Sequence, residues 1–287
     1  MIELHCHTTV SDGTLTPGEL VELAASLGIT HLAITDHDST GGVKEAARAC
    51  GSRDIVLIPG VEMSATYQGR PMDLLGYGID PDDPALSAAL ADMVRRRADR
   101  LGEMLRGLRS AGIELEEDEV IQLAAGGVVG RPHVAQALVR RGVVSSVAEA
   151  FDHYLGRGRP GYVPKENFTP EEAIELITGA GGVAVLAHPR YLKLDDDQFR
   201  ALLDRLMDAG LAGIEVYYSQ HTAEDVARFE RFARQRGLLA TGGSDFHGAN
   251  KPEIRLGIGA LGRPLDETMA EALLERIAAA RHKKAGG

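Results

Sequence analysis

Side chains that commonly bind metal ions recur along this sequence, each group beside a short apolar run. Five stretches carry them: His5-Cys6-His7, Ser11-Asp12-Gly13, Thr35-Asp36-His37-Asp38, Ala187-His188-Pro189 and Ser244-Asp245-Phe246-His247. One such pair would be a weak signal, whereas five groups spread over almost the whole chain are hard to obtain by accident. The pattern predicts a polynuclear metal centre and a metal-dependent hydrolase.

The spacing of His5 and His7 suits a single metal ion. Alternate residues of a strand point to the same face, so both imidazoles can reach one ion. Cys6 then points to the opposite face, and we interpret it as a buried apolar residue. Asp36 and Asp38 flank His37 and are predicted to orient ligands rather than to bind metal directly.

Alternating strands and helices must position these groups. Short apolar runs predict strands at 2–5, 31–35, 55–59, 72–78, 183–187, 213–217 and 238–242, and helical patterns predict helices at 17–27, 42–49, 170–178, 197–209, 223–236 and 268–281. This rhythm is typical of parallel βαβ units and of an α/β fold. The metal-type stretches fall at the C-terminal ends of predicted strands or in the loops that follow, where barrel enzymes place their active sites.

Residues 84–165 interrupt this rhythm. Helical patterns at 86–108, 116–123, 133–140 and 147–155 predict a mostly helical insertion between two parts of a barrel domain, 1–83 and 166–287. Residues 93–165 contain 12 Lys and Arg against 9 Asp and Glu, whereas the whole chain has a net charge of −11. The arginines between Arg95 and Arg109 form either a solvated helix face or a surface that guides a polyanion to the site.

Composition excludes several functions. The 287 residues, 44% of them hydrophobic, can bury a full core. The absence of Trp and the low aromatic content of 5% argue against a base-stacking sheet, and the net charge of −11 argues against non-specific binding to polyanions. No apolar run reaches about 18 residues, and two cysteines make no disulfide framework, so we expect a cytoplasmic protein without a membrane segment.

Together these motifs resemble the polymerase and histidinol phosphatase (PHP) family of metal-dependent phosphoesterases. The resemblance rests on His5-x-His7, Asp12, Thr35-Asp36-His37-Asp38, Gly60-Val61-Glu62, Gly76-Tyr77-Gly78-Ile79-Asp80, Gly130-Arg131-Pro132-His133, Gly161-Tyr162-Val163-Pro164, Ala187-His188-Pro189 and Gly243-Ser244-Asp245-Phe246-His247. It implies a distorted seven-stranded (β/α)7 barrel with a helical insertion. The branch it resembles hydrolyses 3′,5′-bisphosphorylated nucleosides to a 5′-nucleotide and phosphate, and trims 5′-phosphorylated RNA in the 5′–3′ direction.

The resemblance also implies three metal positions. His5, His7, Glu62 and Asp245 would hold the first ion; Asp12, His37 and His247 would hold another; Glu62 would bridge to the remaining position, completed by His188. Many relatives have His where this chain has Asp73, and a carboxylate there shifts the preference from zinc toward manganese or magnesium. We therefore expect two or three divalent ions, with manganese as the predicted metal and zinc, iron or magnesium as alternatives; Asp73 as a simple strand-end carboxylate stays open.

Phosphate ester hydrolysis requires these residue types. Two ions roughly 3.5–4 Å apart hold hydroxide near neutral pH and bind phosphoryl oxygens, and a bridging carboxylate, for which Glu62 is the candidate, fixes their distance. The resemblance places His221 as the general acid toward the leaving oxygen. Arg131, His133 and Lys165 are predicted to bind a second phosphate, since the planar fork of Arg can bond two oxygens. Alternatively, Arg131 only caps the helix that begins near Pro132.

Other function classes stay open at this stage. One is a phosphatase for a small metabolite such as histidinol phosphate, or an amidohydrolase that acts on C–N bonds. Another is a non-catalytic PHP module that serves as a partner platform. Arg131 and Lys165 favour a substrate with two phosphates, so the predicted partner is a phosphorylated nucleotide or a short RNA 5′ end, without an obligate protein partner.

Overall fold

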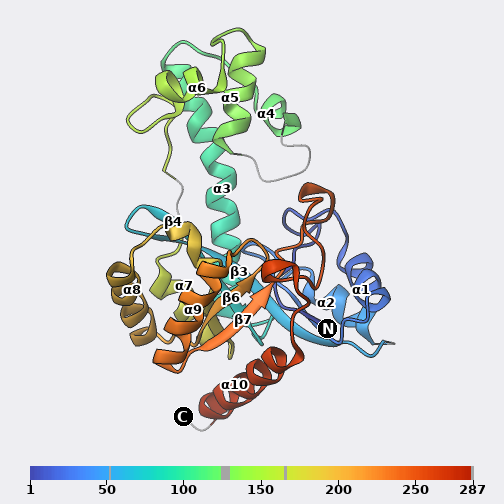
Figure 1. The fold of residues 1–287 in the computed structure, drawn as a ribbon. Helices are drawn as coiled ribbons and strands as arrows, with labels where there is room; N and C mark the ends of the chain where they lie inside the picture. The colour runs from blue at the N-terminus through green and yellow to red at the C-terminus, as the bar shows by residue number, and fades with distance from the viewer. Residues whose placement is uncertain (52, 124–129, 165–166, 286–287) are drawn as a thin grey trace. The chain divides into compact units, whose positions relative to one another are not determined.

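The computed structural model describes residues 1–51, 53–123, 130–164 and 167–285 (Figure 1). The chain divides into two compact units, one of Met1–Leu90 with Asn167–Gly287 and the other of Ala91–Glu166. The division falls between Leu90 and Ala91, later than the predicted boundary between residues 83 and 84. Helix α3 (Pro84–Ser110) begins in the first unit, where Leu86 and Leu90 are part of the core. Among the described residues, no helix is long and apolar enough to cross a membrane.

A seven-stranded sheet forms the centre of the first unit. Its strands, adjacent in chain order, are β1 (Ile2–Glu3), β2 (His31–Ile34), β3 (Val56–Tyr67), β4 (Arg70–Tyr77), β5 (Val183–Leu186), β6 (Gly213–Tyr218) and β7 (Leu239–Gly243). Beyond β1 and β7, the backbone N–H of His7 donates to Phe246 O at 2.9 Å and that of Asp245 donates to His5 O at 2.8 Å. These bonds bring the two edges together and confirm the predicted barrel of seven strands.

Strand β4 departs from the predicted parallel order. It runs antiparallel to both β3 and β5, whereas the other pairs are parallel. Only Gln68 and Gly69 connect β3 to β4, both with positive φ, and a parallel connection needs about a dozen residues or more. The prediction was wrong here because β3 continues to Tyr67, well beyond its predicted end at residue 59. The start of β4 therefore lies beside the end of β5, where Ala187 N–H donates to Asp73 O at 3.1 Å.

Helices surround this sheet and begin at recognisable capping residues. They are α1 (Pro17–Ser26), α2 (Val43–Cys50), α7 (Pro170–Gly179), α8 (Asp196–Asp208), α9 (Ala223–Arg236) and α10 (Glu267–Ala285). Capping boxes open four of them, at Thr16, Thr169, Asp195 and Thr222. In each, the side chain accepts a hydrogen bond from a backbone N–H that has no partner within the helix. This local chemistry explains why the predicted starts lie within one residue of the observed ones.

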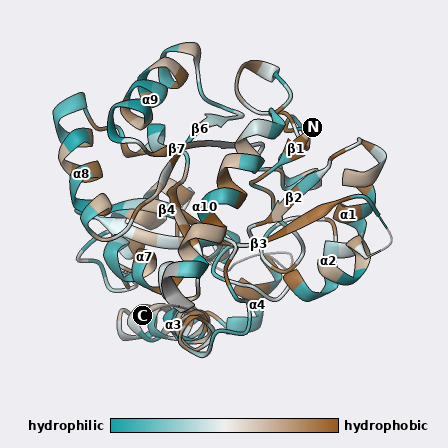
Figure 2. Ribbon diagram, turned by 90° about the horizontal axis from the view of Figure 1, so that it is seen from below, coloured by the Kyte–Doolittle hydropathy of each residue, from teal (hydrophilic) through white to brown (hydrophobic). Residues whose placement is uncertain are grey.

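Apolar side chains join the helices to the sheet. Leu20 of α1 and Leu32 of β2 belong to one core cluster, and Leu273 of α10 packs in another with Val185 of β5. The helices α8 and α9 carry alternating hydrophilic and hydrophobic segments in Figure 2, as expected for helices with one buried face. These apolar faces hold the helices against the sheet. The polar residues of the candidate site lie at the ends of the strands.

The second unit is helical. It contains most of α3, then α4 (Glu117–Leu123), α5 (Arg131–Arg140), α6 (Val147–Ala150) and a single π-helical turn, Phe151–Leu155. A separate core that includes Leu108, Val134 and Leu138 holds these helices together. On α3, both Arg95 and Arg96 pair with Asp92, in agreement with a solvated helix face.

Candidate metal centre

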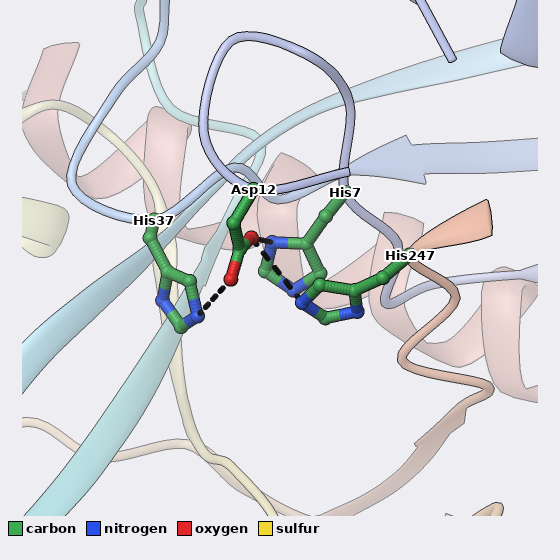
Figure 3. Close-up of side chains that lie close together, drawn as sticks. All are labelled: His7, Asp12, His37 and His247. Carbon is green, nitrogen blue, oxygen red and sulfur yellow. Dashed lines mark ion pairs between the residues drawn. The ribbon is translucent and has the colours of Figure 1, made fainter. Parts of the chain in front are cut away.

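One group of predicted ligands surrounds Asp12 in the loop after β1. Figure 3 shows the carboxylate of Asp12 between the rings of His7, His37 and His247. The distances are 3.2 Å from Oδ1 to His247 Nε2, 3.6 Å from Oδ1 to His7 Nδ1, and 3.9 Å from Oδ2 to His37 Nε2. These side chains come from the loops after β1, β2 and β7, which meet because the strand ends converge.

Glu62 of β3 joins this group to a second one. Its Oε2 lies 3.3 Å from His5 Nε2, 3.2 Å from His7 Nε2 and 3.1 Å from His37 Nδ1. Its Oε1 lies 2.9 Å from His188 Nε2. Four histidines from three separate loops thus point at one buried carboxylate, an arrangement suited to a carboxylate that bridges cations.

All nine residues predicted as ligands fall into compact groups. The groups are His7, Asp12, His37 and His247; His5, His7 and Asp245; His5, Glu62 and His188; and His37, Glu62 and Asp73, and within each the candidate ligand atoms lie within 4.8 Å of one another. They overlap through shared residues, as the ligands of a polynuclear centre do. The structure therefore brings together the complete predicted set, including Asp73, which lies 3.9 Å from His188.

The donor atoms fit divalent cations. Among the described residues, His5 Nε2, His7 Nε2, His37 Nδ1 and Glu62 Oε2 are buried and make no hydrogen bond. A buried polar atom without a partner costs about 1–3 kcal/mol, so such a concentration requires compensation. Imidazole nitrogens and carboxylate oxygens are ligands that first-row divalent ions accept, and cations would compensate all four atoms at once.

The electrostatics of the site also require added positive charge. Burial alone would lower the pKa of His7, but the nearby carboxylates of Asp245 and Glu62 outweigh burial and raise the pKa to about 9. Burial would raise the pKa of Glu62, yet the neighbouring histidines hold it well below its usual value. The carboxylates therefore stay ionised and draw protons onto the histidines where no cation is bound. Bound cations would take over this role.

Two further buried carboxylates hold the ligands in place, and sequence reasoning missed both. Glu215 of β6 accepts hydrogen bonds from His5 Nδ1 and from the backbone N–H of His188, both at 2.8 Å. Glu3 accepts from the backbone N–H groups of His5, Ser244 and Gly257 at 2.9, 3.0 and 2.7 Å. Each is a charged residue within an apolar strand, and that was the signal available in the sequence.

Asp36 and Asp38 accept hydrogen bonds from the segments beside the cluster. Asp36 accepts from the backbone N–H and hydroxyl of Thr8 and from the hydroxyl of Ser11, all at 2.7 Å. Asp38 accepts from the backbone N–H of Ser64 at 2.8 Å. Neither belongs to the compact ligand groups of the described residues.

Backbone strain coincides with the ligand loops. Six described non-glycine residues have positive φ, and three of them are His188, Asp245 and Asp38, with φ of 25°, 60° and 47°. Such conformations cost of order 1–3 kcal/mol each and persist where surrounding contacts impose them. In all three residues the backbone N–H is hydrogen-bonded within the site, that of His188 to Glu215, that of Asp245 to His5 O and that of Asp38 to Glu62 O.

A polar cavity of about 310 Å³ opens beside the cluster. Five predicted ligands line it, together with residues that sequence reasoning did not single out, namely Tyr191, Tyr218, Gln220 and Lys251. Tyr218 OH donates to Asp245 Oδ2 at 3.0 Å, and the ring of Tyr191 packs edge-on against His188 and Tyr218. The cavity therefore combines ligand atoms with hydroxyl, amide and ammonium groups.

His221, predicted as the general acid, lies in the loop after β6 and is almost fully buried. Its Nδ1 donates to Val216 O at 2.8 Å, while Nε2 has no hydrogen-bond partner among the described residues. Burial lowers the pKa of His221, which favours the neutral ring. It is not among the residues that line the cavity.

The predicted phosphate-binding residues belong to the second unit. The guanidinium of Arg131 lies over the rings of Phe151 and Tyr162, at 5.7 and 5.5 Å from their centres, and donates to Leu155 O at 3.4 Å. His133 Nδ1 accepts from the backbone N–H of Gly130 at 3.0 Å, so the ring proton of the neutral form is on Nε2. Lys165 lies outside the described residues.

Enzymes that gather histidines and carboxylates at one end of a strand barrel form a class of metal-dependent hydrolases, and this chain has that design. The sequence model of the PHP domain matches residues 3–210. The chain belongs to the PHP domain family.

Proteins with named functions resemble the chain over most of its length. The 3′,5′-nucleoside bisphosphate phosphatase of Chromobacterium violaceum is 40% identical over 252 residues, which cover 86% of this chain and 87% of that protein. The 5′-3′ exoribonuclease Rnm of Escherichia coli is 38% identical over 247 residues, covering 85% and 84%. A solved structure described as an amidohydrolase from Chromobacterium violaceum, with bound sulfate and no metal, matches with a TM-score of 0.75 and 35% identity over 97% of this chain and 96% of that one.

Proposed function

We propose that this protein is a metal-dependent phosphoesterase that removes the 3′-phosphate from 3′,5′-bisphosphorylated nucleosides, trims 5′-phosphorylated RNA from its 5′ end, or does both. The observation that carries the proposal is the group of four histidines around Glu62, in which three ring nitrogens and one carboxylate oxygen are buried without a hydrogen bond. The names of the two relatives at 40% and 38% identity supply the substrate class. Both reactions break a phosphate ester with water.

The nine clustered residues would hold two or three divalent ions. We propose manganese, because the site combines five imidazoles with four carboxylates, and the extra carboxylate of Asp73 favours a harder ion than zinc. When bound, such ions supply a hydroxide near neutral pH and positive charge for the phosphoryl oxygens. Zinc, iron and magnesium are the alternatives to be compared.

The chain orients its ligands through hydrogen bonds at their second ring nitrogen. His5 Nδ1 bonds to Glu215 and His247 Nδ1 bonds to the backbone O of Asp245, both at 2.8 Å. Each contact places the proton on Nδ1 and leaves Nε2 with a lone pair that points into the cluster. Glu62 and Asp245 lie at the centre of the clustered residues and would help to hold the ions.

We propose that Arg131, His133 and Lys165 bind the phosphate that is not cut. The Nε2–H of His133 is a suitable donor, and the Arg131 guanidinium is held by aromatic rings in one orientation. His221 stays a candidate general acid. That role requires a proton on Nε2, and the lowered pKa of the ring opposes it at neutral pH.

The experiment is a comparison of substrates with manganese present. Phosphate release is measured from a 3′,5′-bisphosphonucleoside and from histidinol phosphate, and the products of a 5′-phosphorylated RNA labelled at either end are separated by size. We expect release of the 3′-phosphate, and 5′-mononucleotides appearing stepwise from the RNA 5′ end. Internal cuts, trimming from the 3′ end, or equal rates on RNA that lacks the 5′ phosphate would contradict the proposal.

Hydrolysis of C–N bonds is the second candidate, because one similar structure is described as an amidohydrolase. The same preparation is assayed on amide substrates and on the bisphosphonucleoside. Amide hydrolysis without phosphate release would favour this alternative.

For the location we keep the prediction of the cytoplasm, which suits the two free and buried cysteines, Cys6 and Cys50.

A further inference from the structure

Lys251 is placed beside the metal-type cluster by the segment that follows β7. It comes directly after the short 3₁₀ turn Gly248–Asn250, four residues beyond His247. Its Nζ lies 2.7 Å from Asp245 Oδ2, and about a third of its side chain, 34%, is exposed. The side chain lines the 310 Å³ cavity together with His37, Glu62, Asp73 and His188.

The carboxylate of Asp245 connects the cluster to the cavity. Its Oδ1 lies 3.6 Å from His5 Nε2 and 3.3 Å from His7 Nε2, on the side of the metal-type atoms. Its Oδ2 accepts from Tyr218 OH and from Lys251 Nζ. The ammonium group is therefore held one carboxylate away from the atoms that would bind metal, on the open side of the cluster.

The charge of the cavity makes this ammonium distinctive. Three carboxylates line it, those of Glu62, Asp73 and Asp245, and Lys251 is the single Lys or Arg among its described lining residues. An ammonium group has three donors, and Asp245 is its one described carboxylate contact, so further N–H groups can bond an incoming anion. In a chain with a net charge of −11, a phosphate needs such local positive charge.

We propose that Lys251 is a catalytic residue that binds a non-bridging oxygen of the phosphate being cut. Asp245 fixes the position of the ammonium, and the remaining N–H groups hold the phosphoryl oxygen over the cluster. The proposal rests on the proposed phosphoesterase function and specifies a residue for the reacting phosphate, whereas Arg131, His133 and Lys165 concern the other one.

The competing explanation is that Lys251 only neutralises Asp245 and so supports the metal-binding residues. Two variants separate these roles. Lys251→Met removes the ammonium, and Tyr218→Phe removes the other hydrogen bond to the same Oδ2 without removing a charge. Lys44→Met is the matched control, because Lys44 forms an ion pair of similar length, 2.6 Å to Asp82, on an exposed surface away from the cavity lining.

The test measures inorganic phosphate binding to the manganese-loaded protein by calorimetry and by inhibition, with metal content determined on the same samples. For Lys251→Met we expect phosphate affinity and kcat/KM to fall about 10- to 150-fold, the loss of one hydrogen bond to a charged group. Metal content stays at the wild-type value. Lys251→Arg recovers part of the phosphate affinity, and Lys44→Met leaves it near that of the wild type. The metal content of Tyr218→Phe shows whether the loss of a hydrogen bond to Asp245 is enough to release metal.

The inference is overturned if Lys251→Met binds phosphate as the wild type does, or if the wild type binds no phosphate. It is also overturned if Lys251→Met loses phosphate affinity because it loses metal, and Tyr218→Phe loses metal as well. Should Lys251→Met fold poorly, Lys251→Gln, which keeps a polar side chain, gives the same comparison. Failure of the proposed substrate is distinguishable. A wild type that binds phosphate through Lys251 but releases none from a bisphosphonucleoside would refute the substrate and leave this residue's role intact.

Discussion

Replacing Glu62 by Gln tests the metal centre most directly. The side chain of Glu62 is 1% exposed, and its two oxygens lie within 3.3 Å of ring nitrogens from four histidines. Glutamine has nearly the same shape, so the change removes one negative charge and one acceptor oxygen without opening a cavity. The variant therefore isolates the charge and the bridging geometry from the packing.

The magnitude follows from the burial of this carboxylate. Removing one partner of a buried ionic pair costs about 3–5 kcal/mol, and each ~1.36 kcal/mol is a factor of ten. We therefore expect Glu62→Gln to lower kcat/KM by about 10²- to 10⁴-fold, together with a loss of bound divalent metal.

The assay combines elemental analysis of dialysed protein with phosphate release from a 3′,5′-bisphosphonucleoside in manganese. Glu22→Gln is the matched control, because the Glu22 carboxylate is exposed and pairs with Arg53 at 3.3 Å on the surface. Unchanged metal content and unchanged kcat/KM in Glu62→Gln would refute the reasoning that Glu62 lies between bound cations.

Three other substitutions test the surrounding structure. Glu215→Gln should weaken metal affinity by about 10- to 100-fold, measured by metal titration, because Glu215 orients His5. Gly243→Ala should lower both metal content and melting temperature, because an added Cβ would lie 2.1 Å from His5 Cβ. Arg131→Ala should cost about 2–3 kcal/mol of transition-state stabilisation, measured from kcat/KM, for a bisphosphorylated nucleotide. Slow hydrolysis of a monophosphate should barely change.

Each of these substitutions has an outcome that would count against it. Metal affinity of the wild-type value in Glu215→Gln would mean that His5 keeps its orientation without this carboxylate. Gly102→Ala is the control for Gly243→Ala, because the added Cβ there has its nearest neighbour at 3.4 Å, the end of the Arg106 side chain. Equal losses on both substrates in Arg131→Ala would assign Arg131 to the fold of the second unit, where it already contacts Phe151, Tyr162 and Leu155.

Local patterns in the sequence were sufficient for the elements of the barrel. The helix beginning at Pro17 follows from Thr16 and Glu19, which form a capping box three residues apart. The strand at 183–186 follows from an apolar run of Val, Ala, Val and Leu that is buried at every position. These signals lie within a few residues of the structure they specify, so they can be read without knowing the fold.

The direction of β4 was not available from such patterns. A strand has the same alternation in either direction, and only the two-residue turn at Gln68 and Gly69 decides that β4 runs back along β3. The turn was obscured because the apolar run of β3 was ended too early in the prediction. This direction places Asp73 beside His188, so it also decides the composition of the ligand groups.

The sequence by itself determined the residue types of the metal-type cluster and, through the resemblance to a known family, the grouping of its members. Only the tertiary structure assigned Glu3, Glu215 and Lys251 to the site. Glu3 reaches Gly257 across 254 residues of sequence, and Glu215 reaches His5 across 210. A buried carboxylate in a strand has no local feature that identifies its partner, because the partner is chosen by barrel closure, which brings the segments after β1, β5 and β7 into contact.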